Sequence, residues 1–300
     1  MTVAGRRPRA GWPGWIACAN VVPVTHAALR PPSHPPLDEG RLAASAPPGL
    51  RFEVLAESPS TNAYAADRAR EGVPAGLVVV TEHQTSGRGR LDRQWQTQPR
   101  SALTFSLLLR PAAPAARWPW LPLVTGLTVT EVLREQGYAA GVKWPNDVLL
   151  SGPAGERKVA GILVERIETP QGPAAVVGIG LNTHMSAEEL PVPTATSLAV
   201  ESRAAGAGGV PERTDLLLAL TAALAGAYDA WEAGDAQART VAAYAAACVT
   251  LGRPVRVELP GDRLLEGEAV RVDDSGQLVV AADGVETAVG AGDVIHVRPR

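Results

Sequence analysis

The sequence predicts an α+β domain followed by a small all-β domain, and three observations support this. The length of 300 residues accommodates about two domains. From Leu50 to Cys248, β-branched or alternating segments are interspersed with segments of helical periodicity. After Gly252, only short apolar segments remain, and turn residues separate them.

The α+β part contains strands and helices in mixed order. Strands are predicted over 51–55, 77–81, 103–109, 158–167 and 174–181, from alternation or β-branched runs. Helices are predicted over 61–71 and 121–136, and a longer one opens at Pro211. Capping hydroxyl and amide groups mark the start of the first helix at Ser58, Ser60, Thr61 and Asn62. The first two helices end at Gly72 and Gly137.

The pattern after Gly252 predicts five short strands. They are predicted over 255–259, 268–272, 277–280, 285–289 and 294–298. Turn residues lie between them at 260–262, 274–276 and 283–284. Strands of this length and spacing favour a small barrel, so the domains are predicted as 48–250 and 251–300.

Residues 1–47 are predicted to be a disordered leader. They contain Pro31, Pro32, Pro35 and Pro36 and show little periodicity. Proline restricts the preceding residue and removes an amide donor. A translation start placed too far upstream would produce the same kind of segment.

Composition narrows the range of functions. The formal net charge is −3, which argues against a nucleic acid as the main partner. The 2 cysteines, Cys18 and Cys248, lie too far apart for a disulfide framework or a zinc cluster, so the cytoplasm is the expected location. No stretch approaches the roughly 20 apolar residues needed to span a membrane, so no membrane partner is expected.

The most informative stretch is Gln84-Thr-Ser-Gly-Arg-Gly-Arg-Leu-Asp-Arg-Gln-Trp95. Its glycines let the backbone approach a ligand closely. Its three arginines, Arg88, Arg90 and Arg93, can each grip phosphate or carboxylate oxygens with two hydrogen bonds. The alternative is a solvated loop or a contact with nucleic acid.

A second motif is Lys143-Trp-Pro-Asn-Asp147, in which a cation and a carboxylate flank a rigid Trp-Pro unit. Asp147 is suited to orient Lys143, or a Mg²⁺ ion that carries ATP phosphates. The alternative is an ordinary turn between strands, with Trp144 packed in the core.

Two strand motifs complete the pattern. Lys158 opens an apolar strand and is expected to enter the site from a sheet edge, with Gly161 leaving room for a flat ligand. The alternative is a lysine that only extends from a strand start into water. Gly178 and Gly180 alternate in another strand and leave one face bare, so something should pack there. A dinucleotide fingerprint and a Walker A loop are absent, and the histidines lack metal-ligand spacing.

In this order, the four motifs resemble the biotin protein ligase family over residues 50–300. The resemblance implies a class II aminoacyl-tRNA-synthetase-like mixed sheet followed by a small SH3-like barrel. It implies ATP and biotin as substrates, with Mg²⁺, and biotinoyl-5′-AMP as the intermediate. The acceptor would be a lysine on the biotin carboxyl carrier domain of an acyl-CoA carboxylase. The enzyme would be a monomer or a homodimer.

The resemblance also implies roles for matching positions. The catalytic residues would be Lys158, Arg88 and Arg90. The biotin-binding residues would be Ser60, Thr61, Asn62, Gln84, Gly87, Arg88, Gly89, Arg90, Lys158, Gly161, Gly178 and Gly180. The ATP-binding residues would be Arg88, Arg90, Arg93, Trp95, Lys143, Asn146, Asp147, Lys158, Asn182 and Arg298.

Two departures from the family pattern remain, and three alternatives to it. The connection Ser151–Glu156, before Arg157 and Lys158, is longer than in some relatives. Asp92 stands where many relatives carry glycine, which makes the loop stiffer and less positive. Residues 1–47 are too proline-rich for a helix-turn-helix domain, so no repressor function is expected. A lipoate or octanoate ligase and a non-catalytic biotin-binding protein are the alternatives within the fold, and an RNA-binding protein is the alternative outside it.

Overall fold

The computed structural model describes residues 34–90, 93–205, 209–234, 237–259, 263–290 and 293–296. The expectations for Asp92 and Arg298 lie outside these ranges. Among the described residues, no helix is both long and apolar enough to cross a bilayer.

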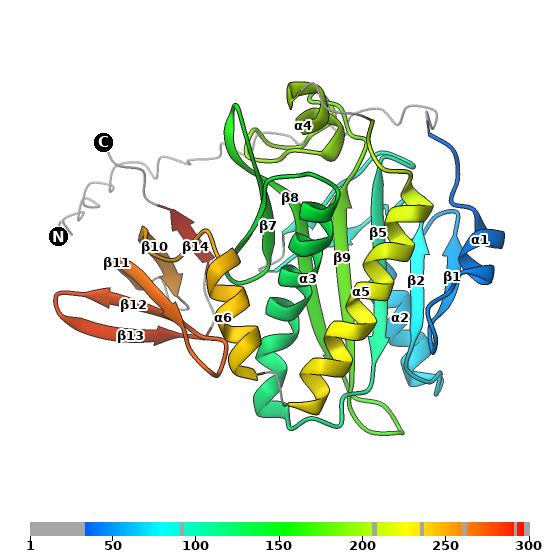
Figure 1. Ribbon diagram of the computed structural model, residues 1–300. Helices are drawn as coiled ribbons and strands as arrows, with labels where there is room; N and C mark the ends of the chain where they lie inside the picture. The colour runs from blue at the N-terminus through cyan, green and yellow to red at the C-terminus, as the bar shows by residue number, and fades with distance from the viewer. Residues whose placement is uncertain are drawn as a thin grey trace, which may run out of the picture.

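A seven-stranded mixed sheet forms the centre of the molecule, in the order β1-β2-β5-β9-β8-β7-β6 (Figure 1). Its strands are β1 (Arg51–Leu55), β2 (Leu77–Thr81), β5 (Ala102–Leu109), β6 (Ala140–Lys143), β7 (Asp147–Gly152), β8 (Gly155–Ile167) and β9 (Ala174–Asn182). Strands β1 and β2 are parallel and the other neighbours are antiparallel. The predicted strands are confirmed, and β6 and β7 are additional.

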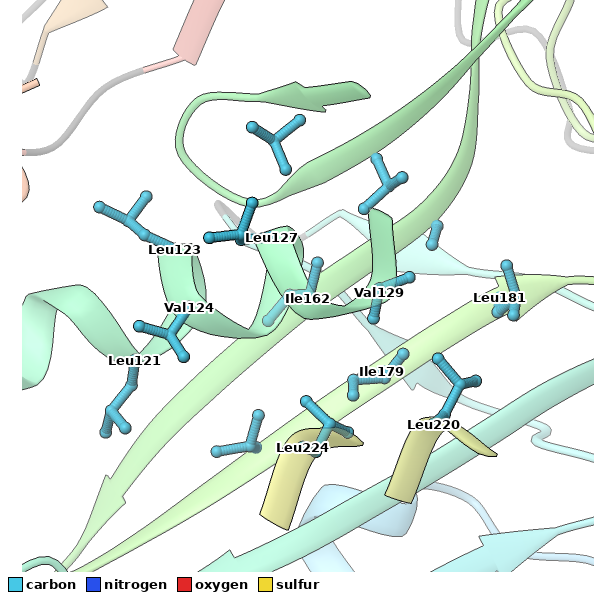
Figure 2. Close-up of a cluster of buried hydrophobic side chains, with 14 of the residues drawn as sticks. Leu121, Leu123, Val124, Leu127, Val129, Ile162, Ile179, Leu181, Leu220 and Leu224 are labelled. Carbon is cyan, nitrogen blue, oxygen red and sulfur yellow. The ribbon is translucent and has the colours of Figure 1, made fainter. Parts of the chain in front are cut away.

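Two long helices, α3 (Leu121–Glu135) and α5 (Arg213–Ala233), cover one face of this sheet (Figure 1). Figure 2 shows their apolar side chains against those of β8 and β9, with Leu127 and Val129 of α3 near Ile162 and with Leu220 and Leu224 of α5 near Ile179. Helix α5 begins at Arg213, after the N-cap Glu212, and therefore two residues later than predicted. This face holds the main core.

Helix α2 (Thr61–Arg70) covers part of the opposite face. Its Ala65 and Ala69 pack against Val79 of β2 and Val176 of β9. Ser60 is its N-cap and accepts a hydrogen bond from the backbone N–H of Ala63, as predicted. Successive strand residues point to opposite faces of the sheet. The strand residues that alternate with those of the main core therefore face the side of α2, and beyond the end of α2 this face is uncovered.

Residues 34–47 are not a disordered leader, and this part of the prediction is wrong. Helix α1 (Glu39–Ala44) lies beside β1, and Leu42 is fully buried in the main core. The buried Arg213 donates a hydrogen bond to the carbonyl of Pro35 and pairs with Glu82 at 2.7 Å. Packing with the distant helix α5 therefore orders a segment that shows little periodicity of its own.

The C-terminal part is an antiparallel five-stranded sheet in the order β13-β12-β11-β10-β14. Its strands are β10 (Pro254–Leu259), β11 (Arg263–Val272), β12 (Leu278–Ala282), β13 (Val285–Val289) and β14 (Asp293–His296). The prediction of a small β domain is confirmed. The indole N–H groups of Trp120 and Trp144 donate to the carbonyls of Asp274 and Gly276, at 2.7 and 3.0 Å, and so attach it to the first domain.

The remaining elements are shorter. They are the hairpin strands β3 (Gly87–Arg88) and β4 (Gln94–Trp95), the 3₁₀ helix η1 (Ala115–Trp120), and the helices α4 (Leu198–Ala205) and α6 (Gln237–Ala247).

Candidate active site

A cleft of about 1350 Å³ opens on the face of the sheet that α2 leaves uncovered. The strands β5, β8 and β9 form its floor through Thr104, Gly161 and Gly180. The β3–β4 hairpin forms one wall, and the small domain contributes residues around His296. Both domains therefore line the same cavity.

Glycines on the floor of the cleft let other side chains pack directly against the strand backbone. A Cβ atom on Gly180 would lie 2.4 Å from the indole ring of Trp95, and one on Gly178 would lie 2.1 Å from Oδ1 of Asn62. The expectation that something packs on the bare face of β9 is confirmed. In this structure, the packing groups are the side chains of Trp95 and Asn62.

A buried polar cluster forms one end of the cleft. Gln84 Oε1 accepts a hydrogen bond from the backbone N–H of Thr61 at 2.9 Å. The fully buried hydroxyl of Ser106 lies 2.6 Å from Asn62 Oδ1 and 2.8 Å from Thr61 Oγ1. These side chains hold one another in fixed orientations, which suits them to recognise a compact polar group.

The Gly/Arg motif is a short hairpin above the floor. Gly87 pairs with Trp95 and Arg88 with Gln94, and the N–H of Gly89 donates to the carbonyl of Arg93 at 2.6 Å. A Cβ atom on Gly87 would lie 2.3 Å from the backbone oxygen of Trp95. Gly87 therefore allows strands β3 and β4 to approach each other closely, and it does not line the cleft.

Two arginines of the hairpin contact the sheet side of the cleft. Arg88 forms an ion pair with Glu165 at 2.9 Å, and Arg90 donates to Asn146 Oδ1 at 3.3 Å. The hairpin thus brings two guanidinium groups to the cleft.

Lys158 forms an ion pair with Asp147, with Nζ and Oδ1 2.6 Å apart. Its ammonium group also lies 5.7 Å from the ring centroid of Trp95. The expectation that Lys158 enters from a sheet edge is wrong, because its backbone is paired on both sides, with Leu149 of β7 and with residues 194–196. The lysine therefore enters the cleft from an interior position.

The Lys143–Asp147 motif is the turn between β6 and β7, and its Trp144–Pro145 peptide bond is cis. Trp144 is buried in the core, as the alternative interpretation expected, while Lys143, Asn146 and Asp147 line the cleft. Asp147 stands opposite Lys143 in the β ladder, but its ion pair is with Lys158. The motif therefore combines a core anchor with cleft-lining groups.

The other end of the cleft lies near the small domain. Asn182 Nδ2 donates to the carbonyl of Thr196, while its buried Oδ1 has no hydrogen-bond partner among the residues that the structure describes. Arg253 grips Glu156 with two hydrogen bonds of 2.6 and 2.7 Å, and this pair lowers the pKa of the Glu156 carboxyl. Burial, followed by the charges of Lys143 and Arg253, lowers the pKa of His296 to about 4.

The structure brings most of the predicted residues together. Those that line the cleft are Ser60, Thr61, Asn62, Gln84, Arg88, Gly89, Arg90, Arg93, Trp95, Lys143, Asn146, Asp147, Lys158, Gly161, Gly178, Gly180 and Asn182. Gly87 supports the hairpin instead, and Arg298 lies outside the described residues.

Sequence reasoning missed the roles of Ser106, Glu165, Glu156, Arg253 and His296. Ser106 was detectable, because Thr104 and Ser106 alternate with apolar residues of β5 and so share a face. The contacts of the others depend on how the hairpin and the small domain sit, which no local pattern encodes. Within the described residues, no three histidine, cysteine or acidic side chains gather as a metal site.

Comparison with known proteins agrees with the geometry. Residues 53–182 match the Biotin/lipoate A/B protein ligase family, and residues 250–297 match the Biotin protein ligase C terminal domain. The chain is 38% identical to the biotin–[acetyl-CoA-carboxylase] ligase of Mycobacterium tuberculosis, over 88% of this chain and 97% of that protein. A ligase of the same name from Paracoccus denitrificans is 33% identical, over 80% and 98% of the two chains.

A solved structure has a similar fold. The biotin protein ligase of Aquifex aeolicus in complex with biotin and ATP superposes with a TM-score of 0.68 at 26% identity. The match covers 83% of this chain and 99% of that one. The similarity therefore includes both domains.

Proposed function

Because the chain belongs to the biotin protein ligase family, we propose that its cleft joins biotin to ATP and then transfers the biotinoyl group to a protein lysine. The observation that carries this proposal is the position of Lys158 beside a glycine-lined floor, in one cleft with a polar pocket and the arginines of the hairpin. A carboxylate and a phosphate that meet at this point would both face cations.

The polar cluster at one end suits the ureido head of biotin. Ser60, Thr61 and Gln84 offer hydroxyl and amide groups, and Gly161, Gly178 and Gly180 leave a shallow floor for the flat bicyclic ring. Asn62 is already hydrogen bonded on both atoms of its amide, so its contribution is to support this end of the pocket.

The first step would be attack of the biotin carboxylate on the α-phosphate of ATP, with loss of pyrophosphate. Two anions must approach, and the cations Lys158, Arg88 and Arg90 would offset their repulsion. Arg93, Lys143, Asn146 and Asn182 would hold the nucleotide, together with the ring of Trp95. The catalysis would consist mainly of positioning and electrostatic stabilisation.

A magnesium ion fits the site only when it is held by the phosphates of ATP as well as by the protein. Mg²⁺ is commonly held by one or two carboxylates together with substrate phosphates, and the cleft supplies Asp147. When bound, the ion would neutralise charge on the leaving pyrophosphate.

In the second step, the acceptor amine would attack the carbonyl of the mixed anhydride and release AMP. The acceptor proposed is the carrier domain of an acyl-CoA carboxylase, in keeping with the names of the relatives. Location in the cytoplasm remains part of this proposal.

ATP–pyrophosphate exchange with biotin or lipoate tests the proposal. We expect exchange with biotin, and its loss in Lys158→Ala, while Lys143→Ala should mainly raise the KM for ATP. Exchange with lipoate alone would assign the chain to the lipoate branch of the fold. Exchange with neither acid would support the non-catalytic alternative.

A further inference from the structure

Glu165 connects the polar pocket of the cleft with the arginine hairpin. Its Oε2 atom accepts a hydrogen bond from Asn62 Nδ2 at 2.7 Å and pairs with Arg88 Nη2 at 2.9 Å. Asn62 belongs to the polar pocket at the start of α2, and Arg88 belongs to the hairpin. One carboxylate oxygen therefore links the floor of the cleft to its cover.

The hairpin needs such a link, because its own ladder is short. Strands β3 and β4 contain two residues each and pair only with each other within the described sheets. A two-stranded hairpin is marginally stable in water, so contacts with the rest of the protein must hold it in place. The Arg88–Glu165 pair is a charged contact of this kind, at the end of the hairpin nearest the polar pocket.

The exposed fractions of the two side chains suit an ion pair that breaks and re-forms. The side chain of Arg88 is 49% exposed, whereas that of Glu165 is 26% exposed and is fixed by Asn62. The anchored partner is therefore the carboxylate, and the guanidinium is the half that can leave when the hairpin opens.

We propose that Glu165 is a positioning residue that latches the arginine hairpin over the cleft and so retains the acyl-adenylate until the acceptor amine arrives. This inference rests on the proposed function. Without the latch, the adenylate would leave the site more often. In solution, water would attack its acyl carbon, the bond between that carbon and the phosphate oxygen would break, and biotin and AMP would form. The net result would be ATP hydrolysis to AMP and pyrophosphate without protein labelling.

The test variant is Glu165→Gln, which keeps the shape and the acceptor oxygen for Asn62 but removes the charge that attracts Arg88. Labelled biotinoyl-AMP is formed on the enzyme, unlabelled biotin is added in excess, and release of label is followed with time. We expect release about fivefold faster than from the wild type, as for loss of a half-exposed ion pair of about 1 kcal/mol. Biotin-dependent AMP formation without acceptor should rise by a similar factor.

Two further variants separate the latch from general structural damage. Glu168→Gln removes the exposed partner of Arg166 at the end of the same strand, and it should leave release unchanged. Ser106→Ala removes the hydroxyl that supports Asn62 from the other side without touching Arg88, and it should raise the KM for biotin by a larger factor than the release rate.

A Glu165→Gln variant that raises the KM for biotin but speeds release no more than Ser106→Ala would overturn the latch. If the variant does not fold, wild-type release can be measured from 0.05 to 1 M KCl, where a half-exposed pair weakens. Release that is independent of salt would then overturn it. Absence of adenylate formation in the wild type would instead overturn the proposed function, and the latch with it.

Discussion

Lys158 and Asp147 form their ion pair across a glycine. Asp147 stands opposite Gly161 in the β7–β8 ladder, and a Cβ atom on Gly161 would lie 3.1 Å from both Cε and Nζ of Lys158. The bare backbone of Gly161 therefore provides the space in which the lysine chain folds back to meet the carboxylate. The ammonium group is held from two sides before any substrate enters.

Substitution of Asp147 should slow catalysis rather than unfold the protein. Asp147→Asn keeps the shape but removes the charge that holds the Lys158 ammonium group, so we expect kcat for pyrophosphate exchange to fall about five- to tenfold. The surface variant Asp67→Asn breaks an exposed pair with Arg70 and serves as the control. An unchanged kcat would mean that Gly161 and Trp95 position the lysine without the carboxylate.

Gly180→Ala should displace the Trp95 ring. The added methyl group would lie 2.4 Å from the indole, so the ring must move away from the floor. We expect the KM values for biotin and ATP to rise on the order of tenfold in steady-state assays, with little change in thermal stability. Gly226→Ala in α5 is the control, because a Cβ atom there would meet nothing within 4 Å among the described residues, apart from its chain neighbours and the backbone of its own helix. That change should leave both KM values unaltered and stabilise the helix by about 0.5–1 kcal/mol.

Folding stability should fall in mild acid, partly through His296. Its pKa is lowered to about 4 by burial, then by Lys143 and Arg253, so the folded protein binds its proton less readily than the unfolded chain. The stabilisation is complete above about pH 6.5 and is lost as the pH falls towards 4. Between pH 7.5 and 5.5, the free energy of unfolding should drop by about 1 kcal/mol more in the wild type than in His296→Gln. Urea titrations at the two pH values measure this difference, and equal drops would contradict it.

The segment before β1 should contribute to stability. Leu42→Ala removes a fully buried side chain from the main core, and we expect the free energy of unfolding to decrease by about 2–4 kcal/mol. Leu264 in β11 is 62% exposed, and Leu264→Ala should change stability by less than about 0.5 kcal/mol. If chemical denaturation gives equal values for the two variants, α1 does not form part of the cooperative unit.

The sequence predicted those elements whose periodicity is local. The alternation in β1 and the buried runs of β2, β5, β8 and β9 identified five strands correctly. Strands β6 and β7 are implied only by the alternative of a turn between strands at Lys143–Asp147, and their bounds are not predicted because the turn interrupts their apolar pattern. Helix α1 escaped because its order depends on Arg213 and Glu82, which lie far along the chain.

For the candidate site too, the sequence predicts residues with a local signal and does not predict their long-range contacts. Motif residues such as Arg90, Lys158 and Gly180 were identified from their spacing, because backbone freedom and charge are visible in the sequence. The partners of these groups were not, since the Arg88–Glu165 and Lys158–Asp147 pairs require the sheet register and the position of the hairpin.

The alternation along β9 has an evolutionary consequence. Gly178, Gly180 and Asn182 face the cleft, while Val177, Ile179 and Leu181 face the main core. Because the two sets never share a position, substrate preference can drift through the first set while the second stays under selection for packing alone. An insertion or deletion of one residue within this strand would exchange the two sets, fill the trough with branched side chains and place glycines in the core. Lineages with this fold should therefore vary β9 by substitution and confine length changes to the loops on either side.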